Sequence, residues 1–139
     1  MYCEHAAVIN SSYIETIFNK ELARNSSAKS DFVLIIPPYP CMACLKKQFD
    51  MAIDMGVFDS LKTTVITPNY LFNDIRAWSQ GLFSNNIVTY DSFSEGYDCE
   101  GYDGVIFCTK NSGGIKDVFL SNKTTDYPLS IFLGEAITK

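Results

Sequence analysis

Two cysteines, Cys41 and Cys44, are separated by two residues in the segment "PPYPCMACLKK", which spans residues 37–47. Thiols at this spacing can form a disulfide and exchange it with another thiol, can supply half of a tetrahedral metal site, or can be neighbouring core side chains. The total of five cysteines is odd and too small for a fold stapled by disulfides. A disulfide in this chain is therefore expected to serve a function rather than the architecture.

The pair lies where an apolar run ends and a helix is expected to begin. At the first turn of a helix the backbone N–H groups point outward and the macrodipole is positive, which favours a thiolate over a thiol. Cys41 would hold that position, and Cys44 would lie one turn further along the same face. We therefore expect Cys41 to be the exposed nucleophile and Cys44 the shielded resolving thiol. Lys46 and Lys47 follow within a turn, and we interpret them mainly as a solvated helix face.

A zinc site is the sharpest alternative, because Cys41, Cys44, Cys99 and Cys108 would supply four thiolates. Structural zinc sites usually contain a second closely spaced pair, whereas the last two cysteines are nine residues apart. We therefore assign no metal ligand. Cys108 alternates with Phe107 along a predicted strand, and we interpret it as an inert core thiol. Cys99 is either an incidental exposed thiol or a third redox residue near the pair.

Other catalytic arrangements find little support in the sequence. His5 is the only histidine, and a Cys–His dyad with Cys41 would require the N-terminus to fold over the site. The aspartates on and after the expected second helix read as solvated surface, and no paired carboxylates indicate hydrolase chemistry. The "NSGG" turn lacks the strand-to-helix setting of a phosphate-binding loop.

Composition and charge exclude several kinds of partner. The 139 residues are 47% hydrophobic and 19% charged, with a net charge of −5 and scattered basic residues, so nucleic acid would meet a repulsive field. No apolar stretch approaches the roughly 20 residues that cross a bilayer, so no transmembrane segment is expected. The N-terminal "MYCEHAAVIN" is no secretory signal, unless a signal or a lipid anchor near Cys3 has been trimmed away. We expect a monomer with one domain over residues 1–139.

Hydrophobic periodicity and breaker residues predict the elements that would position the pair. The three prolines before Cys41 have fixed φ and stiffen the turn that presents it. Apolar stripes predict helices, and runs rich in β-branched residues predict strands. The predicted order is helix 8–24, strand 31–37, helix 41–55 with Gly56 as C-cap, strand 63–67, a helix starting at Pro68 with Leu71, Ile75, Trp78 and Leu82 on one face, strand 86–91, a loop, a hairpin over 105–121, and a final helix capped by Asp126 and started by Pro128.

This order predicts a mixed sheet. Strands that alternate with helices are joined by right-handed crossovers and run parallel, whereas the late hairpin adds antiparallel strands. The continuous apolar run of residues 31–37 predicts a strand buried on both faces, which implies helices on both sides of the sheet. The expected class is α/β, with residues 1–29 forming an N-terminal helix and linker before the core.

The arrangement resembles the thioredoxin superfamily, and more closely its TlpA-like thiol-disulfide oxidoreductases, over residues 30–139. The resemblance begins with the buried strand followed by C-x-x-C and a helix. In that family the strand after the third helix often ends in an aspartate, as "NIVTYD" does at Asp91. The family's hairpin has its counterpart in "GVIFCTKNSGGI", with Phe107, Gly113 and Ile115 in register.

The resemblance implies a thioredoxin-like three-layer sandwich, a mixed central sheet flanked by helices. It implies catalysis by Cys41 and Cys44 on protein thiols and disulfides, with no cofactor beyond the redox-active disulfide. It also favours the bacterial cell envelope, or periplasm, over the cytoplasm. The residues that would contact substrate are Pro40, Met42, Ala43, Asp103 and Gly104.

The chain departs from the family pattern at several positions. The family's cis-proline would fall at Gly104, which keeps a close backbone approach but loses the fixed φ. Pro40 stands where an aromatic residue usually precedes the first cysteine, and Ala43 stands where proline is common. The buried carboxylate found six residues before the first cysteine is Ile35 here. A thioredoxin-like interaction module with a weak or vestigial pair is therefore the second hypothesis, and a metal-binding thiolate site is the third.

Overall fold

The computed structural model describes residues 31–79, 86–90, 104–111, 114–121 and 126–138. The predicted helix over 8–24, the linker to residue 29, Asp91 and Asp103 lie outside the described residues. The strands are β1 (Phe32–Ile35), β2 (Thr63–Pro68), β3 (Ile87–Tyr90), β4 (Ile106–Asn111) and β5 (Gly114–Leu120). The helices are α2 (Met42–Asp54), α3 (Val57–Ser60), α4 (Phe72–Trp78) and α5 (Asp126–Thr138), with a 3-10 turn, η2 (Asn69–Leu71), before α4.

The five strands form one mixed sheet in the order β3-β2-β1-β4-β5. β1 pairs in parallel with β2, and β2 pairs in parallel with β3. β4 runs antiparallel to both β1 and β5. The α/β class and the mixed sheet predicted from the sequence are therefore confirmed. Both parallel connections step in the same direction across the sheet, and right-handed crossovers of this kind place their helices on the same face.

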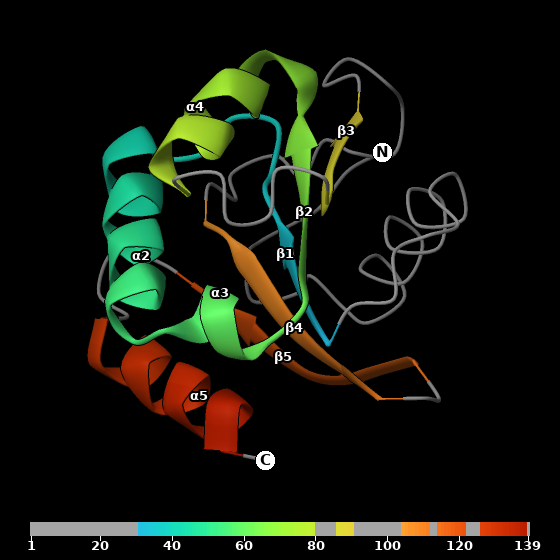
Figure 1. The fold of residues 1–139 in the computed structure, drawn as a ribbon. Coiled ribbons are helices and arrows are strands. Elements are labelled where there is room, and N and C mark those ends of the chain that lie inside the picture. The colour runs from blue at the N-terminus through green and yellow to red at the C-terminus, as the bar shows by residue number, and fades with distance from the viewer. Residues whose placement is uncertain (1–30, 80–85, 91–103, 112–113, 122–125, 139) are drawn as a thin grey trace.

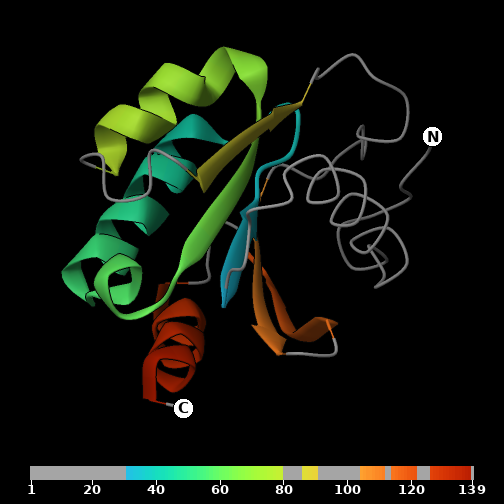
Figure 2. The ribbon, with the colours of Figure 1, turned by 45° about the vertical axis from the view of Figure 1, so that its right-hand side comes forward.

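The four helices of the described part accordingly lie on one face of the sheet (Figures 1 and 2). The opposite face is buried as well, because Val33, Ile35, Ile106 and Cys108 are at most 2% exposed. Burial on both faces agrees with the continuous apolar run that predicted β1. Helices on both faces were predicted, and within the described ranges we observe them on one.

The hydrophobic core lies between the sheet and these helices. Phe32 and Phe107 from neighbouring strands contact each other, with ring centroids 6.2 Å apart. Phe49 of α2 packs against Phe58 and Trp78, which brings α2, α3 and α4 together. Fully buried side chains of α2 and α5 complete this core: Leu45, Ala52, Leu129 and Leu133.

The helix boundaries differ from prediction in three places. The C-cap of α2 is Met55 rather than the predicted Gly56. Gly56 follows with φ +73° and is the N-cap of the short helix α3, which the sequence did not predict. Pro68 does not start the third helix. It is the last residue of β2 and pairs with Tyr90 of β3. Its backbone is extended, and the end of a strand tolerates a residue that has no N–H to donate. α5 begins at Asp126, two residues before Pro128, because proline is tolerated in a first helical turn.

Within the described ranges no helix is long and apolar enough to cross a membrane.

Candidate functional site

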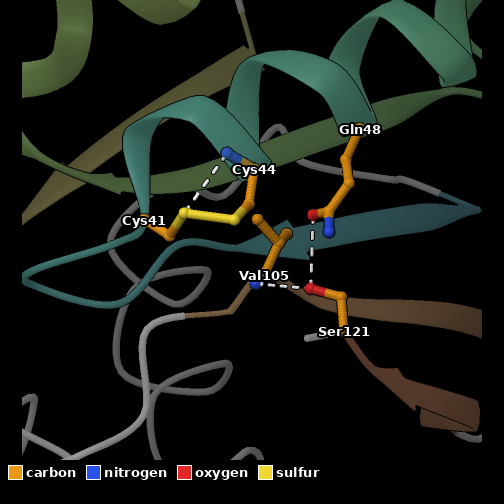
Figure 3. The surroundings of a disulfide bond; sticks show 5 residues. All are labelled: Cys41, Cys44, Gln48, Val105 and Ser121. Atoms are coloured by element: carbon orange, nitrogen blue, oxygen red, sulfur yellow. Dashed lines mark hydrogen bonds between the residues drawn. A yellow bond between two sulfur atoms is a disulfide. The ribbon is translucent and has the colours of Figure 1, made fainter. Parts of the chain in front are cut away.

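Cys41 and Cys44 are joined by a disulfide at the start of α2, with their Cα atoms 5.3 Å apart (Figure 3). Cys41 is the N-cap of the helix: its Sγ accepts a hydrogen bond from the backbone N–H of Cys44 at 3.3 Å, and its carbonyl accepts the N–H of Leu45 at 2.9 Å. Both cysteines are half-buried, so neither is sealed within the core. The predicted position of the pair at a helix start is confirmed.

The electrostatic setting of Cys41 favours a thiolate once the disulfide is reduced. The first turn of α2 contains no acidic residue to oppose a negative charge. The N–H groups of a helix's first turn and the helix dipole stabilise an anion at the N-cap. Lys46 is paired with Asp50 at 2.8 Å on the exposed face of the helix, which agrees with the interpretation of this lysine as solvated surface.

The segment that leads from β1 to Cys41 is held by two tyrosine hydroxyls from elsewhere in the chain. Tyr90 of β3 donates to the carbonyl of Ile36 at 2.5 Å, and Tyr70 of η2 donates to the carbonyl of Pro38 at 2.6 Å. Partial burial, followed by the neighbouring Tyr39, raises the pKa of Tyr70. These contacts hold the segment that presents Cys41, which bends at Pro38 and Tyr39. The sequence analysis did not identify the two tyrosines as part of the site.

Three exposed side chains with apolar area lie close to Cys41 in the chain or on the turn that bonds the segment before it. Tyr39 is 60% exposed, Met42 is 39% exposed and Tyr70 is 54% exposed. Pro40 is half-buried and Ala43 is exposed, so the sequence-predicted substrate residues next to the cysteines do reach the surface. The residues that flank the cysteine pair in the chain are therefore accessible, and some of them are apolar or aromatic.

Gly104 is buried two residues before β4, and its surroundings explain why it has no side chain. A Cβ atom at this position would overlap the backbone carbonyl oxygen of Ser121 and would lie 2.9 Å from the carbonyl carbon. Among the described residues, Gly56 is the glycine with a positive φ. Gly104 therefore does not adopt a left-handed conformation, and what constrains it is the space around it. A proline at this position would place its own Cβ against the same carbonyl.

Substitution of Gly104 by alanine is expected to destabilise the fold by about 1–3 kcal/mol, because a backbone carbonyl cannot turn aside as a flexible side chain can. Urea denaturation would measure this change. Gly134→Ala is the matched control: its new Cβ would lie 3.8 Å from Met55 Cε, an ordinary contact. Because alanine favours a helix over glycine by about 1 kcal/mol, the control should be neutral or stabilising. Equal effects of the two substitutions would contradict this account of Gly104.

Two buried polar side chains behind the disulfide were also missed by the sequence analysis. Gln48 of α2 is 4% exposed, and Ser121, which follows β5, is 1% exposed. The Ser121 hydroxyl donates to Oε1 of Gln48 at 3.2 Å, and its oxygen accepts the backbone N–H of Val105 at 2.8 Å (Figure 3). Gln48 lies at helical spacing from Cys44, and a polar residue within an apolar stripe was the available signal.

Cys108 is fully buried in β4, opposite Val33 of β1. Burial raises the pKa of its thiol to about 12. These properties fit the inert core thiol expected from the sequence. No three His, Cys, Asp or Glu side chains gather as metal ligands among the described residues, and Cys3, His5 and Cys99 lie outside them.

The buried thiol predicts a loss of stability at alkaline pH. Since the pKa of Cys108 is raised on folding from its ordinary value of 9.0, its contribution is complete below pH 9 and is lost as the pH rises toward 12. Between pH 8 and pH 10 the unfolding free energy of the oxidised protein should fall on the order of 1 kcal/mol more than that of Cys108→Ala. Denaturation at both pH values measures the difference, and the other titrating groups cancel between the two proteins. Parallel pH profiles would contradict the prediction.

The fold and the site define an α/β protein with a C-x-x-C disulfide at the start of the helix that follows a central parallel strand. No family model matches the chain, and comparison with curated proteins and with solved structures finds no match. The function is therefore argued from the site itself.

Proposed function

We propose that this chain is a thiol-disulfide oxidoreductase that acts on protein thiols and disulfides through Cys41 and Cys44. The observation that carries the proposal is the half-buried disulfide between the N-cap residue of α2 and a cysteine in its first turn. A thiolate at a helix N-terminus is stabilised by the N–H groups and by the dipole, and it is the form that attacks disulfides.

In the reducing direction the reaction has two exchange steps. The Cys41 thiolate attacks one sulfur of a substrate disulfide, forms a mixed disulfide with it, and expels the other substrate sulfur as a thiolate. Cys44 loses its proton to solvent, and its thiolate attacks Cys41 Sγ. This attack releases the second substrate thiolate and re-forms the Cys41–Cys44 disulfide. Two electrons pass from the cysteine pair to the substrate, and no bound cofactor takes part. The oxidising direction is the reverse.

Protein substrates are favoured by the surface around the pair. Tyr39 and Met42 expose apolar area within two residues of Cys41 in the chain, and exposed apolar area can mark a surface that contacts another polypeptide. Tyr70 is tied to the segment before Cys41 through its hydrogen bond to the Pro38 carbonyl, so this surface and the disulfide belong to one structural unit.

The proposal includes membership of the thioredoxin superfamily, closest to its TlpA-like proteins. The strand order β3-β2-β1-β4-β5, with the cysteine pair directly after the central strand β1, is compatible with that fold and supports the assignment. The bacterial cell envelope is the proposed location, because disulfide exchange between proteins is typical of oxidising compartments.

A trapping experiment tests the proposed function. Reduced Cys44→Ser protein is incubated with a disulfide-bonded peptide, and the product is digested and mapped by mass spectrometry. We expect a mixed disulfide at Cys41 that dithiothreitol releases, because serine at position 44 cannot resolve it. The double variant Cys41→Ser/Cys44→Ser is the matched control and should form no such adduct. Absence of the Cys41 adduct would contradict the proposal and leave the interaction module as the better hypothesis.

A further inference from the structure

The segment between β1 and α2 has few ways to hydrogen-bond with its surroundings. Three of the four residues 37–40 are prolines and have no backbone N–H with which to continue the strand pairing of β1. The Ile36 N–H makes the last of these backbone hydrogen bonds, to the Ile66 carbonyl at 2.8 Å. Beyond it, within the described part of the chain, one hydrogen bond ties residues 37–40 to another element: the Tyr70 hydroxyl donates to the Pro38 carbonyl at 2.6 Å.

Tyr70 reaches this segment from the turn between β2 and α4. It belongs to η2, and the connection from β1 to α2 runs alongside the start of α4 (Figure 1). The side chain of Tyr70 remains 54% exposed, so it is not a core residue that acts mainly by packing. Its link to the segment before Cys41 is therefore chiefly the hydrogen bond of its hydroxyl.

The position of the Pro38 carbonyl is transmitted along the chain to Cys41. Prolines fix φ at three of the four positions before Cys41, which leaves Tyr39 as the residue with a freely rotating φ. Pro37 and Pro38 are buried, so packing also holds the segment. A hydrogen bond adds direction to that packing, because it constrains an angle as well as a distance. A stiff segment of this kind absorbs little of a displacement at Pro38 before it reaches Cys41.

Cys41 is the residue at which such a displacement changes the chemistry. Its Sγ accepts the Cys44 N–H at 3.3 Å, and its carbonyl accepts the Leu45 N–H at 2.9 Å. Both contacts require Cys41 to stay at the N-cap of α2. A thiolate there is stabilised by the N–H groups of the first turn and by the helix dipole, and this stabilisation falls off within a turn.

We propose that Tyr70 is a positioning residue for thiol-disulfide exchange by the Cys41–Cys44 pair. Its hydroxyl holds the Pro38 carbonyl and thereby keeps the Cys41 sulfur at the start of α2, where the thiolate of the reduced pair is stabilised. A pair whose reduced form is stabilised is a stronger oxidant, so the hydrogen bond makes the disulfide more oxidising. The inference rests on the proposed function and names a residue outside the cysteine helix that regulates the redox equilibrium of the pair.

The test measures the equilibrium of the pair with glutathione. One molecule of glutathione disulfide oxidises the reduced pair, which yields the Cys41–Cys44 disulfide and two molecules of reduced glutathione. The full chain is equilibrated with mixtures of the two glutathione forms and quenched with acid, and mass spectrometry reads the state of the peptide that contains both cysteines. In Tyr70→Phe the equilibrium constant should shift roughly threefold toward the protein disulfide, which is the order of effect of one hydrogen bond.

Tyr39→Phe is the matched control. Tyr39 is closer to Cys41 in the chain and is 60% exposed, and its hydroxyl makes no hydrogen bond within the described ranges. Loss of this hydroxyl should leave the equilibrium constant close to the wild-type value. The pH dependence of Cys41 alkylation by iodoacetamide is a second readout, because the thiolate is the reactive form. Its midpoint should move to higher pH in Tyr70→Phe and stay in place in Tyr39→Phe.

Tyr70→Leu also lacks the hydroxyl and should shift the equilibrium as Tyr70→Phe does. A shift in Tyr70→Leu alone would assign the effect to the ring and overturn the inference. An unchanged equilibrium in both variants would overturn it as well, even with a lower melting temperature, because Tyr70 would then only support the fold. A wild-type pair that forms no disulfide in any glutathione mixture would contradict the proposed function itself, whereas normal exchange in wild type and in both Tyr70 variants contradicts this inference alone.

Discussion

Replacement of Cys41 by serine is expected to lower the rate of disulfide reduction by at least about a thousandfold, as removal of a catalytic nucleophile does in other enzymes. The hydroxyl of serine cannot form a disulfide, and the helix N-terminus then has no thiolate to stabilise. The measurement is the steady-state reduction of a protein disulfide in the presence of this protein, with the reaction of the reductant alone subtracted. Cys41 is half-buried at the N-cap of α2. Because serine is itself a favoured N-cap residue, the substitution should preserve the start of this helix.

The control for this substitution is Cys108→Ala. That change removes a thiol which is fully buried in β4 and whose pKa is raised to about 12 by burial. Since such a thiol is protonated and inaccessible at neutral pH, the variant should retain the wild-type rate. The reduced forms of wild type and Cys41→Ser should also melt at similar temperatures. More than a tenth of the wild-type activity in Cys41→Ser would mean that another cysteine is the nucleophile.

The sequence predicted the local frame of the site because the signals for it are local. A continuous apolar run predicted β1, and the apolar stripe after Cys41 predicted α2 with the cysteine pair at its first turn. Alternation of strands and helices then predicted the parallel part of the sheet, and the Gly-rich turn predicted the antiparallel hairpin. These features follow from patterns that span fewer than about 20 residues.

The contacts that lock the site join residues far apart in the chain, and no local pattern encodes them. Tyr90 bonds Ile36 across 54 positions, and Ser121 bonds Gln48 across 73 positions. The resemblance to the thioredoxin superfamily suggested that Gly104 stands where that family has a proline. The structure adds a different reason for glycine, the carbonyl of Ser121, which becomes visible only when the ends of β4 and β5 are placed together. Which residue a given side chain contacts depends on how the strands and helices pack together. The residue type alone does not determine it.

The largest expected effect on stability comes from Phe49→Ala. Phe49 is 1% exposed on α2, and its ring centroid lies 5.9 Å from that of Phe58 and 6.2 Å from that of Trp78. Truncation removes the contact at which three helices meet and leaves a cavity that the backbone cannot close completely. A loss of about 3–5 kcal/mol is expected, which is a large part of the roughly 5–15 kcal/mol that stabilises a domain. Urea denaturation of the oxidised protein measures it.

Ile131→Ala is the matched control, because Ile131 lies on α5 with 47% of its surface exposed and should change the unfolding free energy by less than about 1 kcal/mol. Phe49→Leu should fall between the two, since leucine retains most of the buried volume. If Phe49→Ala lost no more stability than Ile131→Ala, the three-helix contact would not support α2. The predicted loss also concerns the candidate site, because Phe49 lies on the same helix as Cys44 and Cys41 caps that helix. The proposed exchange requires the N-terminus of this helix to stay in place.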